Sequence, residues 1–314
     1  MPLEELHREI ERRWPEHLER TRELLRTPSV SMTGEGIEET AGKLTDWLGA
    51  MGAKTKLFKA RRGSHPLVVG NLDVGSEVTG IVYGMYDVQP VGDLSLWDSP
   101  PFAAEIVRRK PFGEVVVARG ACNSKGSLAG TLLATEAMVD KGELPLNLIF
   151  LIEGEEELGG ESLPRYVIKN KSTLGKADSA WGFDYMENEM GVPTFPLGMK
   201  GCVYFDLEVR GGPDGGPLDG DVHSADAVVI HSPVWRLVQA LSTMVDEEQD
   251  PAIDGLADDV LPPTDGDRKL IKDLAKRMSL DEFKQTLSVA KLKDKGTKEE
   301  ILTKYLFRPS VNID

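Results

Sequence analysis

The stretch NLIFLIEGEEELGG, residues 147–160, runs from a nearly continuous apolar segment straight into a cluster of glutamates. An unbroken apolar run of this length, rich in Ile, Leu and Phe, is typical of a strand buried on both faces of a sheet. Two earlier stretches, HPLVVGNL (65–72) and VTGIVYGMYDV (78–88), have the same character. The sequence therefore predicts three buried strands.

Helical patterns alternate with these strands. Apolar residues recur at helical spacing from Leu3 to about Leu25, and again over residues 36–51. A third helix is predicted over GSLAGTLLATEAMVDKG (126–142), between the second and third strands. Strands that alternate with helices favour an α/β fold, with a mostly parallel sheet and flanking helices.

The character of the chain changes at GMKG, residues 198–201. The next segment, CVYFDLEVR (202–210), alternates between apolar and polar residues and predicts a strand, and VWRLVQALSTMVDEE (234–248) predicts a helix. We therefore expect two domains: an α/β domain over residues 1–197 and a smaller α+β domain over residues 198–314.

The net charge restricts the partners. The chain carries 37 Lys and Arg against 52 Asp and Glu, a formal net charge of −15, which repels nucleic acids and anionic membranes. Cys122 and Cys202 lack the spacing of a zinc site and are expected to be reduced thiols. The charged N-terminus does not resemble a signal peptide, and no apolar run reaches the length of a membrane span. The sequence predicts a cytoplasmic protein with neither a nucleic-acid nor a membrane partner.

The glutamates that follow the strand at 147–152 repel one another unless something neutralises them. A divalent metal could do so, with one glutamate as a ligand and its neighbour as a general base. Alternatively, Glu155, Glu156 and Glu157 could begin a helix and complement its dipole. Both interpretations remain open at this point.

Other polar segments also follow predicted strands, where open α/β sheets bind their ligands. Their sequences form an ordered series of motifs: GMYDVQPVGDLSLWDSPPF (84–102), RGACNSKG (119–126), EEELGG (155–160), Asp184 nine residues before Pro193, GMKG (198–201) and DVHSA (221–225). This series resembles the M20 family of metallopeptidases and deacylases, in particular its carnosinase-like dipeptidase branch. The resemblance extends along nearly the whole chain, to RPSVNID (308–314).

The resemblance implies a zinc-exopeptidase-like catalytic domain and a lid domain that forms a homodimer. It also implies a metal-dependent hydrolase of peptide or N-acyl amide bonds, acting on a small peptide or an N-acyl amino acid. The roles that it assigns are Glu156 as general base, Glu157 and Asp184 as metal ligands, His223 as oxyanion donor and Arg308 as the group that binds the substrate carboxylate.

Three departures from the family pattern weaken the metal site. Met85 stands where the family has a histidine ligand, and Asn123 stands where it has a bridging aspartate. A thioether is a soft ligand and an amide oxygen is neutral, so we expect at most one ion per subunit, zinc or alternatively manganese, with Asn123 as a weak ligand. The family's last histidine ligand lies beyond the segment that matches RPSVNID. Asp87, which in the family orients the missing histidine, either ligates directly or loses that role.

Two alternatives to metal-dependent hydrolysis follow from these departures. The first is a non-catalytic M20-like protein that retains the fold for binding or assembly. The second is a cysteine hydrolase that uses Cys122 with His223 as its base. A buried Cys122 that only fills space is the simpler interpretation of this thiol.

Overall fold

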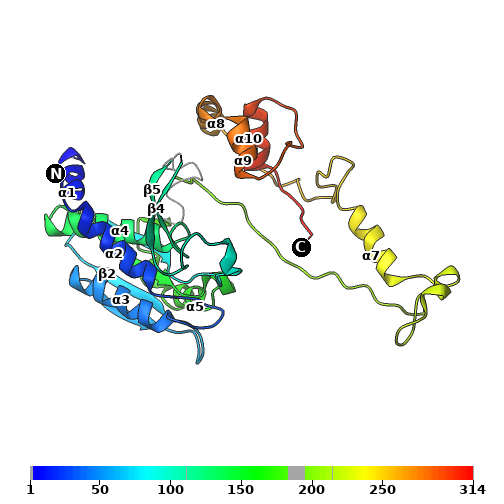
Figure 1. The fold of residues 1–314 in the computed structure, drawn as a ribbon, viewed down its shortest axis with the longest axis horizontal. Coiled ribbons are helices and arrows are strands. Elements are labelled where there is room, and N and C mark those ends of the chain that lie inside the picture. Colours follow the sequence, from blue (N-terminus) through cyan, green and yellow to red (C-terminus); the bar gives the residue numbers. More distant parts are fainter. Residues whose placement is uncertain (1–2, 111, 183–194, 214, 314) are drawn as a thin grey trace. The chain divides into compact units, whose positions relative to one another are not determined.

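The computed structural model describes residues 3–110, 112–182, 195–213 and 215–313. The chain divides into two compact units, Met1–Gly198 and Met199–Asp314, called unit 1 and unit 2 below (Figure 1). Each unit has a fold of its own.

Unit 1 contains a five-stranded sheet with the strand order β1-β2-β6-β3-β7. Along the chain these strands are β1 (Lys54–Phe58), β2 (Leu67–Leu72), β3 (Thr79–Met85), β6 (Asn147–Glu153) and β7 (Ser179–Gly182). Strand β3 pairs in parallel with β6 and β7, whereas β2 pairs antiparallel with β1 and β6. Four strands therefore run in one direction with β2 reversed, and the predicted mostly parallel sheet is confirmed.

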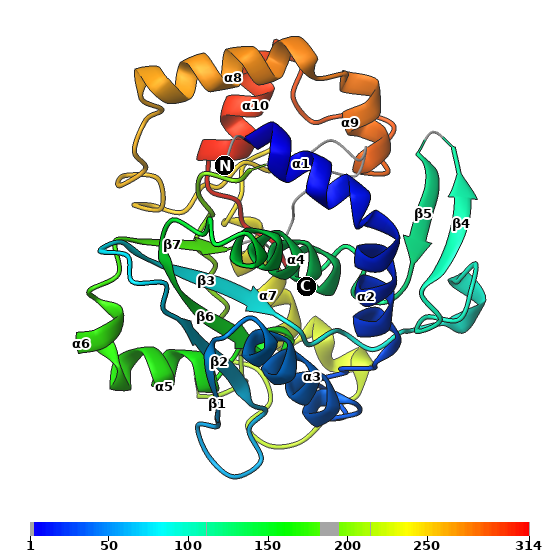
Figure 2. The same cartoon turned by 90° about the vertical axis from the view of Figure 1, so that its left-hand side faces the viewer.

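Helices cover both faces of this sheet (Figure 2). They are α3 (Ile37–Ala50) and α4 (Lys125–Asp140) on one face, and α5 (Ser162–Lys169) and α6 (Lys171–Leu174) on the other. Leu44 of α3 and Leu132 of α4 belong to the same buried cluster as Phe150 of β6. Tyr166 of α5 packs on the opposite face with Leu151 of β6. The alternating side chains of the central strand thus contribute to two cores, as its continuous hydrophobicity predicts.

The predicted helix from Leu3 to about Leu25 is in fact two helices, α1 (Leu3–Arg12) and α2 (Trp14–Arg26). Pro15 lies in the first turn of α2. Proline has no backbone N–H and its ring clashes with the carbonyl four residues earlier, so it is tolerated at a helix start and not in a helix interior. The interruption at Arg13 follows from this constraint.

A separate hairpin precedes α4 in the sequence. Strands β4 (Glu105–Arg109) and β5 (Gly113–Val117) pair antiparallel with each other as a two-stranded sheet. Like the edge strands β1 and β7, they are short and partly exposed. None of these four strands contains a buried residue, in contrast to the central ones.

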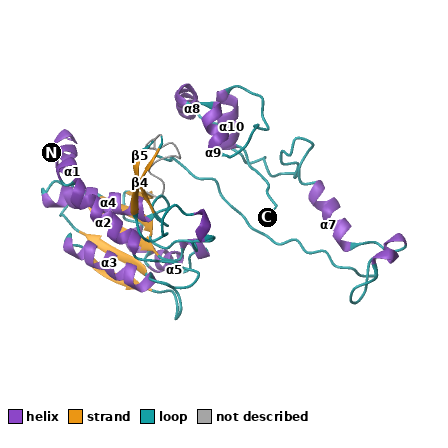
Figure 3. Cartoon of the chain, in the orientation of Figure 1, coloured by secondary structure: helices purple, strands orange, loops and turns teal. Residues whose placement is uncertain are grey.

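The regular elements of the described part of unit 2 are helices, joined by long loops (Figure 3). Its helices are α7 (Pro233–Ser242), α8 (Asp265–Arg277), α9 (Leu280–Thr286) and α10 (Lys298–Phe307), preceded by a short 3-10 turn, η3 (Ser224–Val228). Ile271 and Ala275 of α8 pack with Leu302 of α10 in a small apolar cluster. Helices α8 and α10 each begin with a capping box, at Thr264 and Thr297, which satisfies backbone N–H groups at their N-termini.

The prediction of a strand over residues 202–210 is wrong, because the described part of unit 2 contains no strand. The segment is open to solvent, with Val203 82% and Leu207 50% exposed. Apolar alternation favours an extended backbone, but a strand also needs a neighbour with which to share N–H and C=O groups. The described residues of unit 2 supply no such neighbour, so the α+β character predicted for this part of the chain is not observed.

Two glycines in α4 provide a matched test of this packing. A Cβ atom at Gly126 would lie 2.0 Å from the carbonyl oxygen of Ala121, whereas nothing lies within 4 Å of one at Gly130. We expect Gly126→Ala to lower the free energy of unfolding by about 1–3 kcal/mol through this overlap. Gly130→Ala should raise it by up to about 1 kcal/mol, because alanine favours the helix. Urea unfolding followed by circular dichroism measures both, and equal effects would contradict the close approach.

Candidate active site

Two neighbouring strands of the unit 1 sheet end side by side, and three of the candidate residues follow them. Met85 at the end of β3 is in register with Glu153 at the end of β6. Asp87 follows the end of β3 in the chain, and Glu155, Glu156 and Glu157 follow the end of β6. This is the carboxyl edge of parallel strands, where α/β proteins bind ligands.

Asp87 connects the two strand ends. It is fully buried, and its Oδ1 and Oδ2 accept hydrogen bonds from the backbone N–H groups of Glu156 and Glu157, each at 3.1 Å. These residues begin a 3-10 turn, η2 (Glu156–Leu158). Burial raises the pKa of Asp87, while the N–H donors and the Ser31 hydroxyl oppose that shift. Asp87 therefore fixes the position of the turn that carries the predicted base and ligand.

Glu155 connects the same turn to α5. Its carboxylate accepts the backbone N–H groups of His65 at 2.6 Å, Ser162 at 2.9 Å and Glu161 at 3.1 Å. Burial raises its pKa, but these donors outweigh burial and hold the pKa below its usual value. The side chain thus acts as an anionic cap at the start of α5.

Glu153 is the third buried carboxyl and is 4% exposed. The Tyr83 hydroxyl donates a hydrogen bond to its Oε1 at 2.6 Å. Burial raises the pKa of Glu153 to about 7, opposed by Tyr83 and reinforced by the charges of Asp87, Glu156 and Glu155. The cluster thus reduces its repulsion partly by retaining a proton and partly through hydrogen-bond donors.

The predicted base and ligands of unit 1 lie near the surface of this edge. Glu156 is exposed, and half-buried Glu157 accepts a hydrogen bond on Oε2 from the Gln89 amide at 2.9 Å. Asn123 lies in the loop before α4, where its Oδ1 accepts the Ser124 hydroxyl at 2.5 Å. Asp184, the remaining predicted ligand, lies outside the described residues.

The loop that carries Asn123 packs against the segment that follows β3. Arg119 donates to the carbonyl oxygen of Pro90 at 3.0 Å, and a Cβ at Gly120 would lie only 2.8 Å from Val88. Cys122 is exposed in this loop, which corrects the expectation of a buried, space-filling thiol. The loop turns at the protein surface before α4 enters the core.

Lys125, at the start of α4, is fully buried. Its ammonium group donates to the carbonyl oxygens of Thr27 at 2.7 Å and Leu24 at 3.3 Å, at the end of α2. Burial, together with the charge of Lys43, lowers its pKa to about 7. The side chain ties the loop of Asn123 to the N-terminal helices.

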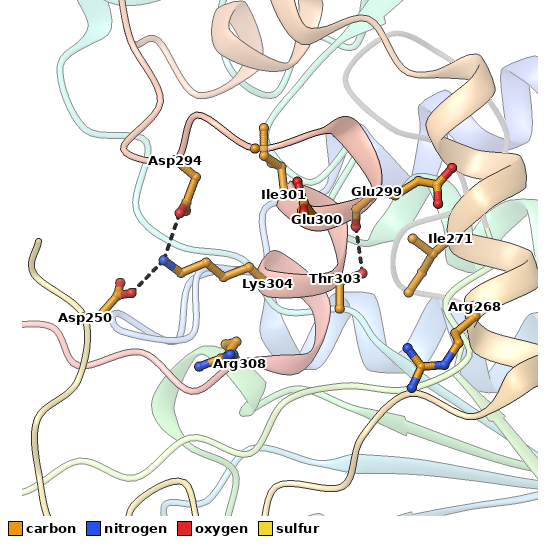
Figure 4. Close-up of a pocket in the computed structure, with 11 residues that line it drawn as sticks. Asp250, Arg268, Ile271, Asp294, Glu299, Glu300, Ile301, Thr303, Lys304 and Arg308 are labelled. Carbon is orange, nitrogen blue, oxygen red and sulfur yellow. Dashed lines mark hydrogen bonds and ion pairs between the residues drawn. The ribbon is translucent and has the colours of Figure 1, made fainter.

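The remaining two predicted residues belong to unit 2. His223 is exposed and its Nδ1 accepts the backbone N–H of Ala225 at 3.2 Å. Arg308 follows α10 and lines a hollow of about 730 Å³ together with Arg268 (Figure 4). In the same hollow, Lys304 is paired with Asp250 and Asp294, at 2.7 and 3.0 Å (Figure 4).

The structure thus brings Asp87, Glu156 and Glu157 together, and it adds partners that sequence reasoning missed. Tyr83 is one of these partners, and the pattern of strand residues could have identified it. Side chains two residues apart on a strand share a face, so Tyr83 and Met85 face the same way, and the strand register then places Glu153 beside them. No sequence pattern identifies the backbone N–H groups that donate to Asp87 and Glu155.

The carboxylates thus gather at the carboxyl edge of an α/β sheet, which is compatible with the catalytic domain of a peptidase. The family model described as "Peptidase family M20/M25/M40" matches residues 81–279, and the chain belongs to this family. No helix among the described residues is long and apolar enough to cross a membrane.

Curated relatives include two dipeptidases. The Cys-Gly metallodipeptidase of Candida albicans is 30% identical over 289 residues, covering 86% of this chain and 58% of the relative. The Beta-Ala-His dipeptidase of Homo sapiens is 31% identical over 259 residues, covering 79% and 47%. The chain thus spans about half the length of these relatives.

A solved structure of an M20 family metallo-carboxypeptidase from Sulfolobus solfataricus matches with a TM-score of 0.78 and 34% identity. The match covers 95% of this chain and 65% of that one. Human carnosine dipeptidase 1 matches with a TM-score of 0.71 at 23% identity, covering 99% of this chain and 66% of that one, which shows a shared fold.

M20 metallopeptidases use a divalent metal, but the described side chains do not fit a metal site by themselves. Among them, no three His, Cys, Asp or Glu side chains gather where they could hold one ion. The thioether of Met85 is 2% exposed, and the carboxylate oxygens of Asp87 already accept two backbone N–H groups. This donor set differs from the carboxylate and imidazole ligands that zinc and manganese prefer.

Glu153→Gln tests the raised pKa of the buried carboxyl. A pKa that rises from 4.5 to about 7 on folding means that the folded protein keeps a proton that the unfolded chain loses. Glu153 therefore costs stability progressively as the pH rises through this window. The glutamine variant is neutral throughout, so its stability relative to wild type should increase between pH 4.5 and 7, by up to about 3 kcal/mol.

Urea unfolding at both ends of the window measures this difference. Glu77→Gln, at an exposed position, is the matched control and should follow the wild type. A difference between Glu153→Gln and wild type that stays constant with pH contradicts the raised pKa.

Proposed function

We propose that the protein hydrolyses peptide bonds in small peptides, with N-acyl amino acids as the alternative substrates. The observation that carries this proposal is the double hydrogen bond of Asp87, which holds Glu156 and Glu157 side by side at the carboxyl edge of the sheet. Two relatives are named for the dipeptides Cys-Gly and Beta-Ala-His, which favours dipeptides as the first substrates to test.

In this proposal Glu156 is the general base that takes a proton from the attacking water, since its exposed carboxylate is accessible to a substrate. Asp87 positions the turn, and Glu157, Asp184 and weakly Asn123 hold at most one divalent ion, zinc or manganese. Unit 1 corresponds to the catalytic domain proposed over residues 1–197.

The proposed lid domain, residues 198–314, supplies the remaining roles. His223 stabilises the oxyanion across a homodimer, and Arg308 binds the substrate carboxylate. The hollow beside Arg308 supports the second role, because Lys304 is neutralised there by Asp250 and Asp294 while the guanidinium of Arg308 has no ion pair among the described residues. We propose a cytoplasmic location for the dimer.

A second candidate function is binding or assembly without catalysis. Met85 and Asn123 favour it, because neither a buried thioether nor a neutral amide is suited to bridge divalent cations. Asn123 lies outside the two apolar clusters of unit 1, whereas Met85 is a buried apolar side chain at the end of β3.

Glu156→Gln tests the general base. The variant keeps its size and loses its proton acceptor, so turnover of Cys-Gly and β-Ala-His should fall by about 100-fold or more. Release of the free amino acids gives the rate, and Glu77→Gln should retain the wild-type rate. Unchanged turnover in Glu156→Gln would refute its role as base. A wild-type protein that hydrolyses neither peptide nor any N-acyl amino acid would favour the binding function.

Metal content distinguishes the proposed single-ion site from a two-ion site. After dialysis against zinc or manganese and gel filtration, elemental analysis should find at most one equivalent per chain. The reason is that Met85 and Asn123 replace two ligands of the family pattern. Two tightly held equivalents would contradict the proposal.

A further inference from the structure

The buried carboxylates at the ends of β3 and β6 each have hydrogen-bond donors from the protein itself. We infer that this acidic edge keeps its folded form without a bound metal ion and gains little stability from one, because protein donors satisfy the charges that a cation would otherwise neutralise. The inference does not rest on Glu156 as general base. It is compatible with the proposed ion only where that ion binds weakly, because an ion held tightly by the folded chain alone would stabilise it.

Asp87 provides the first step. Both of its carboxylate oxygens accept backbone N–H groups at 3.1 Å, and the Ser31 hydroxyl adds a third donor. Backbone donors that are fixed by the fold stabilise a buried anion without an added cation. An ion that used Asp87 as a ligand would have to displace contacts that hold the turn η2 in place.

Glu155 and Glu153 repeat the pattern. Three backbone N–H groups surround the carboxylate of Glu155, between 2.6 and 3.1 Å. The hydroxyl of Tyr83 donates a hydrogen bond to Glu153 at 2.6 Å. Every buried carboxylate in this edge therefore has a donor that comes from its own unit, and an unpaired buried charge does not arise.

The side chains in the positions of the proposed ligands are similarly engaged. Asn123 accepts the Ser124 hydroxyl and Glu157 accepts the Gln89 amide. Met85 is buried against the sheet and offers only a thioether. An ion that binds here would replace existing contacts, so we expect it to add little to the stability of the fold.

Thermal unfolding of the full chain tests the inference. The midpoint should be the same, within about 1 °C, in excess EDTA and in excess manganese, and also in excess zinc in a Cys122→Ser/Cys202→Ser background. An ion that binds only the folded state at a hundred times its dissociation constant would raise the midpoint by about 5 °C or more. A rise of that size in manganese or zinc, or a corresponding fall in EDTA, overturns the inference.

Variants of the buried acceptor Asp87 and of the proposed ligand positions complete the test. Asp87→Asn should lower the midpoint by about 5 °C, equally in EDTA and in manganese, whereas the exposed Asp46→Asn should not change it. A midpoint that falls in Asp87→Asn only with manganese would show that Asp87 acts through the ion.

The ligand positions are tested separately. In Met85→His/Asn123→Asp, or in Asn123→Asp alone, the unfolding midpoint should rise with metal, a response that wild type lacks. Equal metal responses in wild type and these variants contradict the inference.

Discussion

The hydrogen bonds between the carboxylate of Asp87 and the N–H groups of Glu156 and Glu157 are the constraint on which the candidate site depends. They join the chain beyond β3 to the turn beyond β6, although the two segments are about seventy residues apart in sequence. The Gln89 amide adds a contact from the same segment to Glu157, and Glu155 holds the other side of the turn at the start of α5. A single buried aspartate thus converts two neighbouring strand ends into one rigid edge.

The central part of the fold could be predicted because its strands β2, β3 and β6 are apolar on both faces. Helix α4 lies between β3 and β6 in the sequence, which indicates an alternation of strand and helix. Edge strands such as β1 and β7 have one exposed face and little apolar content. The segment 202–210 shows the converse error, since its alternation indicates an extended chain and cannot specify a pairing partner. For the site, the sequence indicates Asp87 and the glutamates, but the donors that satisfy them are mostly backbone N–H groups, which every residue but proline possesses.

The comparisons and the site residues bear on different properties of the chain. The family match spans residues 81–279, and the structural match with a TM-score of 0.78 covers 95% of this chain, so both include parts of unit 1 and of unit 2. Asn123 lies outside the two apolar clusters of unit 1, whereas Met85 is a buried apolar side chain at the end of β3. The proposed hydrolase and binding functions differ in a few side chains at one edge of a common scaffold.

The buried ammonium of Lys125 has a consequence for how the chain can be shortened. Its two described acceptors, the carbonyl oxygens of Leu24 and Thr27, belong to the end of α2 and not to the sheet. A protein trimmed only of α1 keeps both acceptors, whereas one trimmed past Thr27 loses both and leaves a buried amine without these hydrogen-bond partners. The smallest autonomous form of unit 1 must therefore include α2, even though that helix contributes none of the candidate site residues.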